Sequence, residues 1–388
     1  MISFDNTEIA FRSKNRQDLQ RAYLLFQIIG APSIVKIGKI LTPLALRMRL
    51  PIKGLIKSTI FKQFCGGETI DGCESTIQEL EKAKIGTILD YSVEGEESEK
   101  SFQKTKEEIL KTIRKSAENP AIPFAVFKVT GIFKAELLEK AQTEAELTEE
   151  EQELFDHSKD LLMEICDLAH ALKVRLFIDA EESWIQTTID QLTYEMMAKY
   201  NQETAIIYNT FQMYRHDMLA NLKEAIAAAE EKNYFLGVKL VRGAYLEKER
   251  QKAHEDEYSE PLHVCKEDTD RDYDLGVELC LKHVDRVHFC MGTHNESSCL
   301  RLCDAMNALQ IPSNHPNIYF AQLLGMSDNI SYNLAASGYN VAKYVPYGPV
   351  DAVMPYLFRR AEENSSIAGQ TSREFALLQK EVNRRNNA

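Results

Sequence analysis

The 388-residue sequence lacks the motifs that mark several common classes of enzyme. No GxGxxG follows an apolar run and no GxxxxGK occurs, so the usual nucleotide-binding loops are absent. No HExxH or GxSxG is present, so hydrolysis by a zinc-activated water or by an elbow serine has no visible basis. The eight cysteines form no CxxC pair, and we interpret them as reduced thiols that bind no metal.

Long apolar runs and positive charge are also scarce. No run approaches the roughly 18 apolar residues that a membrane-spanning helix needs. The net charge is −13, and because nucleic acid binding requires a basic surface we expect no nucleic acid partner. The first residues, MISFDNTEIAFRSKNRQDL, carry acids and lack the Arg- and Ser-rich pattern of a mitochondrial targeting peptide. We therefore expect a cytoplasmic protein, or one bound peripherally to the inner membrane.

One segment inverts the acidic balance. Residues 31–66 contain seven basic residues and no acid, interleaved with isoleucine, leucine and phenylalanine. They indicate either a segment that docks on an anionic membrane or a partner, or an amphipathic arm packed against the acidic body. With a helix expected over residues 13–29, we predict a helical arm over 1–66 and a catalytic domain over 67–388. The basic residues are Lys36, Lys39, Arg47, Arg49, Lys53, Lys57 and Lys62.

From residue 85 onward, short apolar runs rich in β-branched residues alternate with segments long enough for a helix. Eight such runs favour parallel βαβ units that close into a (βα)8 TIM-type barrel, with a doubly wound sheet as the alternative. The interval at 134–172 holds an acid-rich insertion, in which Thr148 and Glu151 have the spacing of a capping box. The expected strands are 85–93, 124–130, 174–178, 205–210, 235–241, 287–293, 318–323 and 341–345.

Polar and ionisable residues recur at the carboxyl ends of these expected strands, where a barrel keeps its active site. A single lysine such as Lys128 is more often a paired core residue than a functional one, but a polar group at every strand end favours a site. These residues are Glu96, Lys128, Asp179, Asn209, Lys239, Arg242, Thr293, His294, Asn295, Gln322 and Tyr344.

Two stretches stand out. In VKLVRGAYLEKER, an apolar strand runs into Arg242, Gly243 and Ala244, which favours either an anion site or a tight turn with a solvated basic pair. The second stretch, at 344–366, predicts a helix from about residue 350. Its paired arginines could grip a carboxylate, or form a charged outer face. This helix carries Tyr356, Arg359, Arg360 and Glu363 at spacings of three or four.

Together, these stretches resemble the proline dehydrogenase family, and most closely its single-function, mitochondrial-type branch. The resemblance extends from about residue 66 to the C-terminus. It rests on KLVRGAYLEKER at 239–250, GTHN at 292–295, IDAEE at 178–182, YNTFQMY at 208–214, and YVPYGPV with YLFRRAEENSS within 344–366.

The resemblance implies a distorted (βα)8 barrel that holds FAD and oxidises L-proline to Δ1-pyrroline-5-carboxylate, the first step of proline catabolism. Hydride would pass from C5 to FAD N5 and electrons to a membrane quinone, and a separate dehydrogenase would consume the product. By resemblance, Lys128, Arg359 and Arg360 hold the proline carboxylate, and Tyr344, Tyr356 and Leu240 cup the ring with support from Asp179. Glu96 would pair with Arg359 as a gate, and Glu363 would orient the arginines.

The resemblance also implies the FAD contacts, which are Asn209, Lys239, Arg242, Gly243, Ala244, Thr293, His294, Asn295 and, more weakly, Gln322. Bifunctional members carry tryptophan where this chain has Leu246, so adenine must be held differently. The bulk of Tyr344 favours proline over hydroxyproline. The alternatives are oxidation of hydroxyproline or another secondary amine, a flavin-free aldolase that uses Lys128 or Lys239 as a Schiff base, and a binding scaffold without turnover.

Overall fold

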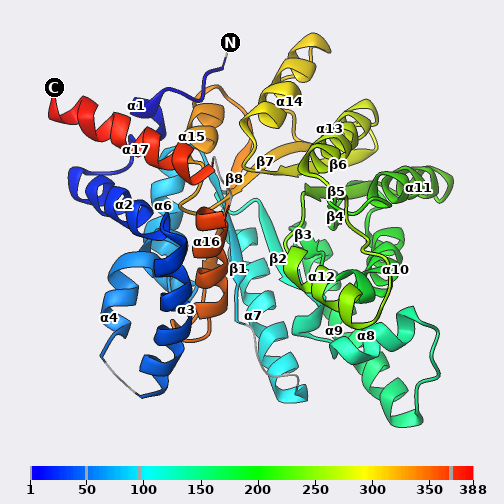
Figure 1. The fold of residues 1–388 in the computed structure, drawn as a ribbon. Coiled ribbons are helices and arrows are strands. Elements are labelled where there is room, and N and C mark those ends of the chain that lie inside the picture. The colour runs from blue at the N-terminus through cyan, green and yellow to red at the C-terminus, as the bar shows by residue number, and fades with distance from the viewer. Residues whose placement is uncertain (1, 49–50, 94–97, 367–369, 388) are drawn as a thin grey trace. The chain divides into compact units, whose positions relative to one another are not determined.

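Eight parallel strands close into a barrel, in chain order from β1 to β8 (Figure 1). A computed structural model describes residues 2–48, 51–93, 98–366 and 370–387. Each strand overlaps one of the eight predicted apolar runs, so the prediction of a (βα)8 barrel is confirmed. The strands are β1 (Gly86–Tyr91), β2 (Phe124–Lys128), β3 (Arg175–Asp179), β4 (Ile207–Gln212), β5 (Leu236–Val241), β6 (Val287–Gly292), β7 (Ile318–Leu323) and β8 (Val341–Tyr347).

Helices follow the strands as the alternation predicts. The capping box is confirmed, because Thr148 accepts from the Glu151 amide and the Glu151 side chain accepts from the Thr148 amide. The interval at 134–172 contains two helices, α8 (Ala135–Gln142) and α9 (Glu149–Ala171). The others from α6 onward are α6 (Glu74–Lys82), α7 (Glu99–Glu118), α10 (Ser183–Tyr200), α11 (Met218–Glu231), α12 (Leu246–Glu255), α13 (Lys266–Lys282), α14 (Glu296–Ala308), α15 (Asp328–Ala336), α16 (Met354–Ser366) and α17 (Gln370–Asn386).

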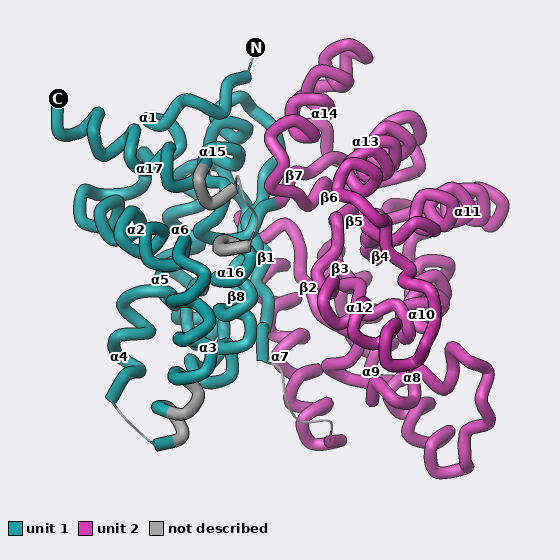
Figure 2. The backbone as a smooth tube through the Cα atoms, in the orientation of Figure 1, with its two compact units in different colours: residues 1–95, 322–388 teal, residues 96–321 magenta. Residues whose placement is uncertain are grey.

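The chain divides into two compact units, residues 1–95 with 322–388 and residues 96–321 (Figure 2). This division runs through the barrel rather than at residue 66, so the predicted boundary of the N-terminal arm stays a prediction. All eight cysteines are free thiols, and seven of them are buried.

In unit 2 (residues 96–321), aromatic rings fill the interior at the amino ends of the strands. Phe124 stacks on Phe177 with ring centroids 4.2 Å apart, and Tyr208 and Tyr319 meet these rings edge-on. The Arg175 guanidinium lies 5.4 Å and 5.3 Å from the centroids of Phe124 and Tyr319. Because these residues come from four strands, their side chains mark the face of each strand that points into the barrel.

In unit 1 (residues 1–95 and 322–388), N-terminal helices pack on α16 and α17 around a shared apolar cluster that includes Phe26, Phe64 and Leu357. Tyr23 stacks on Phe375 with ring centroids 4.9 Å apart. These helices are α1 (Thr7–Ala10), α2 (Arg16–Ile29), α3 (Pro32–Arg47), α4 (Lys53–Ile56) and α5 (Lys62–Phe64).

The basic segment is engaged with acids of the same unit. Lys39 Nζ lies 2.6 Å from Glu362 Oε1, and Lys62 Nζ lies 3.4 Å from Asp18 Oδ1. Lys53 pairs with Asp351 and Lys57 pairs with Glu68. Exposed ion pairs of this kind contribute little to stability, about 0–1 kcal/mol each.

The same helices leave large apolar side chains exposed. Along α3 these are Ile34, Ile37, Ile40 and Leu41, of which Ile40 is 72% exposed. Their spacing places them along one stripe, while Val35 is buried. Among the described residues, no single helix is long and apolar enough to cross a membrane. Residues 16–29 and 32–42 pass that test together, as a pair bent by 93°.

Candidate active site

Three predicted residues meet at the carboxyl ends of neighbouring strands in unit 2. Lys239 on β5 forms an ion pair with Asp179, the last residue of β3. Lys239 is 5% exposed, and its Nζ lies 5.5 Å from the centroid of the Phe177 ring, inside the barrel. Lys128 ends β2 in register with Asp179, and its Nζ lies 5.9 Å from the Tyr245 ring centroid. Leu240, the next residue of β5, is fully buried, but it lies on the strand face opposite to Lys239 and its side chain packs toward Gly276 of α13, so the structure does not bring it to this cluster.

A buried acid, Glu181, lies beside this cluster. It is 3% exposed, and its carboxylate accepts hydrogen bonds from the Thr130 amide at 3.0 Å and from the Thr130 hydroxyl at 2.5 Å. Burial raises the pKa of Glu181 to about 7, while the positive charge of Lys128 acts in the opposite direction. The sequence showed Glu181 in an acidic run after a strand, but nothing there distinguished it from Glu182.

Gln212 is a second residue that the sequence did not single out. It is 2% exposed and is paired in register with Val241 of β5. Two residues earlier on the same two strands, Thr210 is paired with Lys239. Because side chains alternate along a strand, Thr210 and Gln212 share the face that carries Lys239. Gln212 Nε2 donates to the Glu181 carbonyl at 2.7 Å, and its Oε1 accepts from the Ala244 amide at 3.1 Å. It therefore links the ends of β3 and β5.

Asn209, a predicted FAD contact, is placed differently. Its side-chain amide donates to Asp190 Oδ1 on α10 at 2.8 Å, and its Oδ1 accepts from the Thr210 amide at 2.9 Å. Asn209 lies in register with Val238, so it occupies the face of β4 opposite to that of Thr210. The structure does not bring its side chain together with Lys239.

Arg242 is the centre of a second group, at the adjacent ends of β5 and β6. Its guanidinium donates to Asp270 Oδ1 at 2.7 Å, to Thr293 Oγ1 at 2.6 Å and to Ser298 Oγ at 3.0 Å. The guanidinium carbon also lies 4.2 Å from the Tyr273 ring centroid. These contacts hold one permanent cation at the edge of the strand ends.

The turns on either side of this cation contain the other predicted FAD contacts. Asn295 caps α14, because its side chain accepts from the Ser298 amide at 3.1 Å. The neighbouring His294 is half-buried. Gly243 has φ +143°, and a β-carbon there would lie 2.4 Å from the Tyr214 ring, so only glycine fits this turn.

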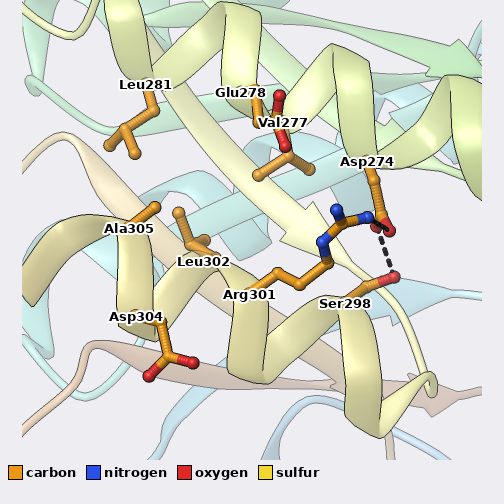
Figure 3. A pocket seen from close by; sticks show the side chains of 9 residues that line it. All are labelled: Asp274, Val277, Glu278, Leu281, Ser298, Arg301, Leu302, Asp304 and Ala305. Atoms are coloured by element: carbon orange, nitrogen blue, oxygen red, sulfur yellow. Dashed lines mark hydrogen bonds and ion pairs between the residues drawn. The ribbon is translucent and has the colours of Figure 1, made fainter. Parts of the chain in front are cut away.

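A shallow groove of about 240 Å³ lies between α13 and α14 (Figure 3). Asp274 on its rim accepts from Ser298 Oγ at 2.6 Å and from Arg301 at 2.8 Å. Ser298 thus joins the groove to Arg242, and Asp274 helps to fix Ser298 in place.

The predicted arginine cluster lies on α16 in unit 1. Arg360 is 7% exposed, forms an ion pair with Glu363, and has its guanidinium carbon 5.2 Å from the Tyr356 ring centroid. Burial raises the pKa of Glu363, against the pull of Arg360 and Arg359. Arg359 is half-buried. The spacing of three or four therefore does bring Tyr356, Arg360 and Glu363 together on one face of the helix, as predicted.

Tyr356 carries a buried hydroxyl with no hydrogen-bond partner among the described residues. Burial raises the pKa of this hydroxyl, so it remains protonated and available as a donor. A buried polar atom of this kind costs free energy unless something bonds to it, which points to a ligand atom.

The remaining predicted residues of unit 1 lie on β7 and β8. Tyr344 on β8 is 8% exposed. Gln322 on β7 is 2% exposed, and its Oε1 accepts from the Ser331 hydroxyl at 2.8 Å. Glu96, the predicted gate, lies outside the described residues.

The donor set in unit 2 fits an anionic dinucleotide such as FAD. Two cations, Lys239 and Arg242, lie on adjoining stretches of one strand end, with the Thr293 hydroxyl and the amino end of α14 next to Arg242. Positive side chains and a helix amino end are suited to a pyrophosphate. Among the described residues there is no group of three or more histidine, cysteine or acidic side chains that could hold a metal ion.

A comparison with known protein families shows which family this chain belongs to. The family model described as Proline dehydrogenase matches residues 73–373, more than half of the chain. The chain belongs to the proline dehydrogenase family. Both candidate clusters, on the strand ends of unit 2 and on α16, lie within the matched residues.

Individual members of the proline dehydrogenase family align over most of the chain. The mitochondrial proline dehydrogenase 1 of Dictyostelium discoideum is 34% identical over 379 residues, covering 86% of this chain and 66% of its own length. The hydroxyproline dehydrogenase of Xenopus laevis is 29% identical over 421 residues, covering 99% of this chain and 90% of its own length. This chain thus spans slightly less than two thirds of the Dictyostelium protein.

The fold is shared with a solved member of the proline dehydrogenase family. The crystal structure of proline utilization A from Bdellovibrio bacteriovorus, inactivated by N-propargylglycine, superposes with a TM-score of 0.74 at 19% sequence identity. The match covers 95% of this chain and 39% of that chain. At this identity, the likeness concerns the fold alone.

Proposed function

We propose that the protein is an FAD-dependent proline dehydrogenase that catalyses the first step of proline catabolism. L-Proline loses a hydride from C5 and a proton from the ring nitrogen to give Δ1-pyrroline-5-carboxylate, and the two electrons pass to a membrane quinone. One observation supports this proposal above the others. The match to the family model, over residues 73–373, contains every residue that we assign to substrate or cofactor.

The substrate carboxylate is assigned to cationic side chains. Arg359 and Arg360 on α16 can form paired hydrogen bonds with a carboxylate, and Lys128 adds a point charge. Glu363 restrains Arg360 through their ion pair. The gate role of Glu96 rests on the resemblance alone, because Glu96 lies outside the described residues.

The pyrrolidine ring is assigned to Tyr344 and Tyr356, both of which are buried. Leu240, which the resemblance also implies, is not included because its side chain packs toward α13. The unpartnered hydroxyl of Tyr356 would bond to the ligand. Asp179, held by Lys239, would support this wall.

FAD is assigned to the strand ends of unit 2, and when bound it supplies the hydride acceptor at its N5 atom. Lys239 would balance the negative charge that reduction places on the flavin ring. Arg242, Thr293, His294 and Asn295 would hold the pyrophosphate, with Gly243 and Ala244 giving close backbone approach. Gln322 is a further FAD assignment, and Gln212 joins it because it shares the face of Lys239. Asn209 is withdrawn from the FAD contacts, because its amide is bonded to Asp190 on the opposite face of β4.

The experiment is a visible spectrum of the purified protein before and after anaerobic L-proline. A flavin spectrum that bleaches on addition of proline is the expected result. A flavin that ignores proline would redirect the proposal to another secondary amine, with hydroxyproline first. A colourless protein that gains no activity with FAD, together with a lysine trapped by borohydride and substrate, would replace it with the Schiff-base aldolase.

Hydroxyproline is the second candidate substrate, because the Xenopus hydroxyproline dehydrogenase aligns with 99% of this chain. Tyr344 would crowd the ring carbon that bears the hydroxyl, and on this ground we favour proline. The ratio of kcat/KM for the two substrates decides between them. Tyr344→Ser should shift this ratio toward hydroxyproline.

We also propose that the exposed stripe of α3 docks on an anionic membrane, where the quinone resides. Ile37 and Ile40 would enter the headgroup region, with Lys36 facing the anionic lipids, while Lys39 is engaged with Glu362. Vesicles with and without phosphatidylserine test this by co-sedimentation. Ile37→Glu together with Ile40→Glu should abolish binding. Reversing the charge of Lys36, Lys39, Arg47 and Arg49 should weaken it, and binding that ignores both changes would remove the proposal.

A further inference from the structure

Glu181 occupies a buried position that the proposed reaction does not use. It follows β3 by two residues, and its carboxylate is bonded to the turn at Thr130, two residues after Lys128. Its own amide donates to Gln186 Oε1 at 2.7 Å, and its carbonyl accepts from Gln212 Nε2 at 2.7 Å. Four hydrogen bonds therefore hold this acid against the ends of β2, β4 and α10.

Two charged side chains act on the Glu181 carboxyl. The charge of Lys128, two residues before the Thr130 to which Glu181 is bonded, lowers its pKa, and the charge of the adjacent Glu182, which pairs with Lys248 of α12, raises it. The ring of Tyr245 lies beside the same lysines, with its centroid 5.9 Å from Lys128 Nζ and 5.4 Å from Lys248 Nζ. Asp179 is paired with Lys239, so Lys128 is the cation whose charge acts on Glu181.

We propose that Glu181 is a positioning residue that takes up one proton from solvent when a carboxylate binds to Lys128. This inference rests on the proposed role of Lys128 as a ligand of the proline carboxylate. An arriving carboxylate shares the charge of Lys128 and repels the ionised form of Glu181, because two carboxylates near one cation compete for it. The buried acid then becomes neutral, and the net charge of the cluster is unchanged.

Binding of a carboxylate and protonation of Glu181 should favour each other. In the free protein, burial raises the pKa of Glu181 to about 7, so ionised and neutral forms coexist near neutral pH. Binding a carboxylate raises this pKa further, so affinity for the carboxylate falls as pH rises through this range. Proline oxidation would therefore show a KM that rises above pH 7. The value of kcat, which depends on loss of the amine proton, would rise with pH as well.

The test uses the flavin-loaded full-length protein and tetrahydrofuran-2-carboxylate, which keeps the ring and carboxylate of proline but has no amine to titrate. Calorimetric titrations in two buffers with different ionisation enthalpies measure the protons taken up per ligand. For the wild type at pH 7, we expect uptake of about half a proton, and affinity about tenfold weaker at pH 8.5 than at pH 6.

Three variants separate the proposal from a structural role. Glu181→Gln keeps the shape and can still accept from the Thr130 amide. It should take up no proton and bind the probe more tightly than the wild type at pH 8.5, which a misfolded protein would not do. Glu182→Gln removes a charge one residue away and should retain the uptake. Thr130→Val deletes one hydrogen bond to the carboxylate and should move the midpoint of uptake to higher pH.

The outcomes are distinguishable. Uptake that is absent in the wild type, or that persists in Glu181→Gln, overturns the role of Glu181 and leaves the proposed function intact. If the probe does not bind and proline does not bleach the flavin, the proposed function itself fails.

Discussion

The buried acid Glu374 on α17 should make the stability of the protein depend on pH. This side chain is 6% exposed and accepts a hydrogen bond from the Ser327 amide, at the start of α15. Burial, reinforced by the negative charge of Asp328, raises the pKa of Glu374 from 4.5 to about 7. Ionising this acid in the folded protein is therefore more costly than ionising it in the unfolded chain.

The surrounding charges explain why Asp328 and not Glu374 is the favoured anion. Lys343 is fully buried and donates to Asp328 Oδ1 at 2.9 Å and to the Met326 carbonyl at 2.6 Å. Lys14 lies 3.2 Å from the other carboxylate oxygen of Asp328. Burial opposes ionisation of Asp328, but these two cations lower its pKa to about 2. Glu374 is attracted more weakly than Asp328 to Lys343 and Lys14.

Ionisation of Glu374 should lower the stability of the folded protein as pH rises. Because the folded pKa of Glu374 lies above its unfolded value, its contribution is fully present below pH 4.5 and is lost as pH rises through about 7. The difference between a pKa of 4.5 in the unfolded chain and about 7 in the folded protein corresponds to about 3 kcal/mol. Glu374→Gln stays neutral and can still accept from the Ser327 amide. It should therefore be more stable than the wild type at pH 8, by up to about 3 kcal/mol.

Urea denaturation at pH 4.5, 6 and 8, followed by circular dichroism, measures this difference. Glu381→Gln is a control on the same helix. Glu381 is fully buried and pairs with Arg384 and Arg385, whose hydrogen bonds lower its pKa against the effect of burial. Its loss should destabilise the protein above pH 4.5, the opposite sign. Parallel pH profiles for the wild type and Glu374→Gln would refute the reasoning.

Further predictions concern the turn glycines, the two candidate clusters and pH. Gly325→Ala should lower the thermal midpoint by several degrees, because φ is +75° and the new β-carbon would lie 2.0 Å from the Gln63 carbonyl oxygen. Gly54→Ala, with nothing within 4 Å and a position inside α4, should not lower it and should raise it slightly, because alanine favours a helix over glycine. Arg360→Ala should weaken binding of tetrahydrofuran-2-carboxylate by at least tenfold, corresponding to ~1.5–3 kcal/mol, and retained affinity would favour a scaffold without substrate specificity. Lys239→Met should lower the amount of FAD retained through gel filtration, and full retention would contradict its assignment. Proline oxidation should accelerate from neutral pH toward pH 9, since hydride loss requires a neutral amine, and a flat profile would count against that chemistry.

Much of the fold was predictable from local patterns. The eight apolar runs of β-branched residues became the eight strands, because each run was long enough to be buried and was separated from the next by a helix-length segment. The capping box at Thr148 and the spacing along α16 were equally local. In both cases the residues that interact lie within one or two helical turns of each other, so their contact follows from helix geometry.

The order of the elements and the residues that share a helix face are therefore local properties that the sequence predicts. Which distant side chains meet depends on closure of the barrel, as for Lys239 with Asp179, 60 residues earlier, and Arg242 with Thr293, 51 residues later. The tertiary structure also decided which face of β4 points inward. All six residues of that strand are buried, so hydrophobic alternation could not show that Gln212, and not Asn209, shares the face of Lys239. The burial of Glu181 has the same origin, because it depends on closure of strands that are far apart in the chain.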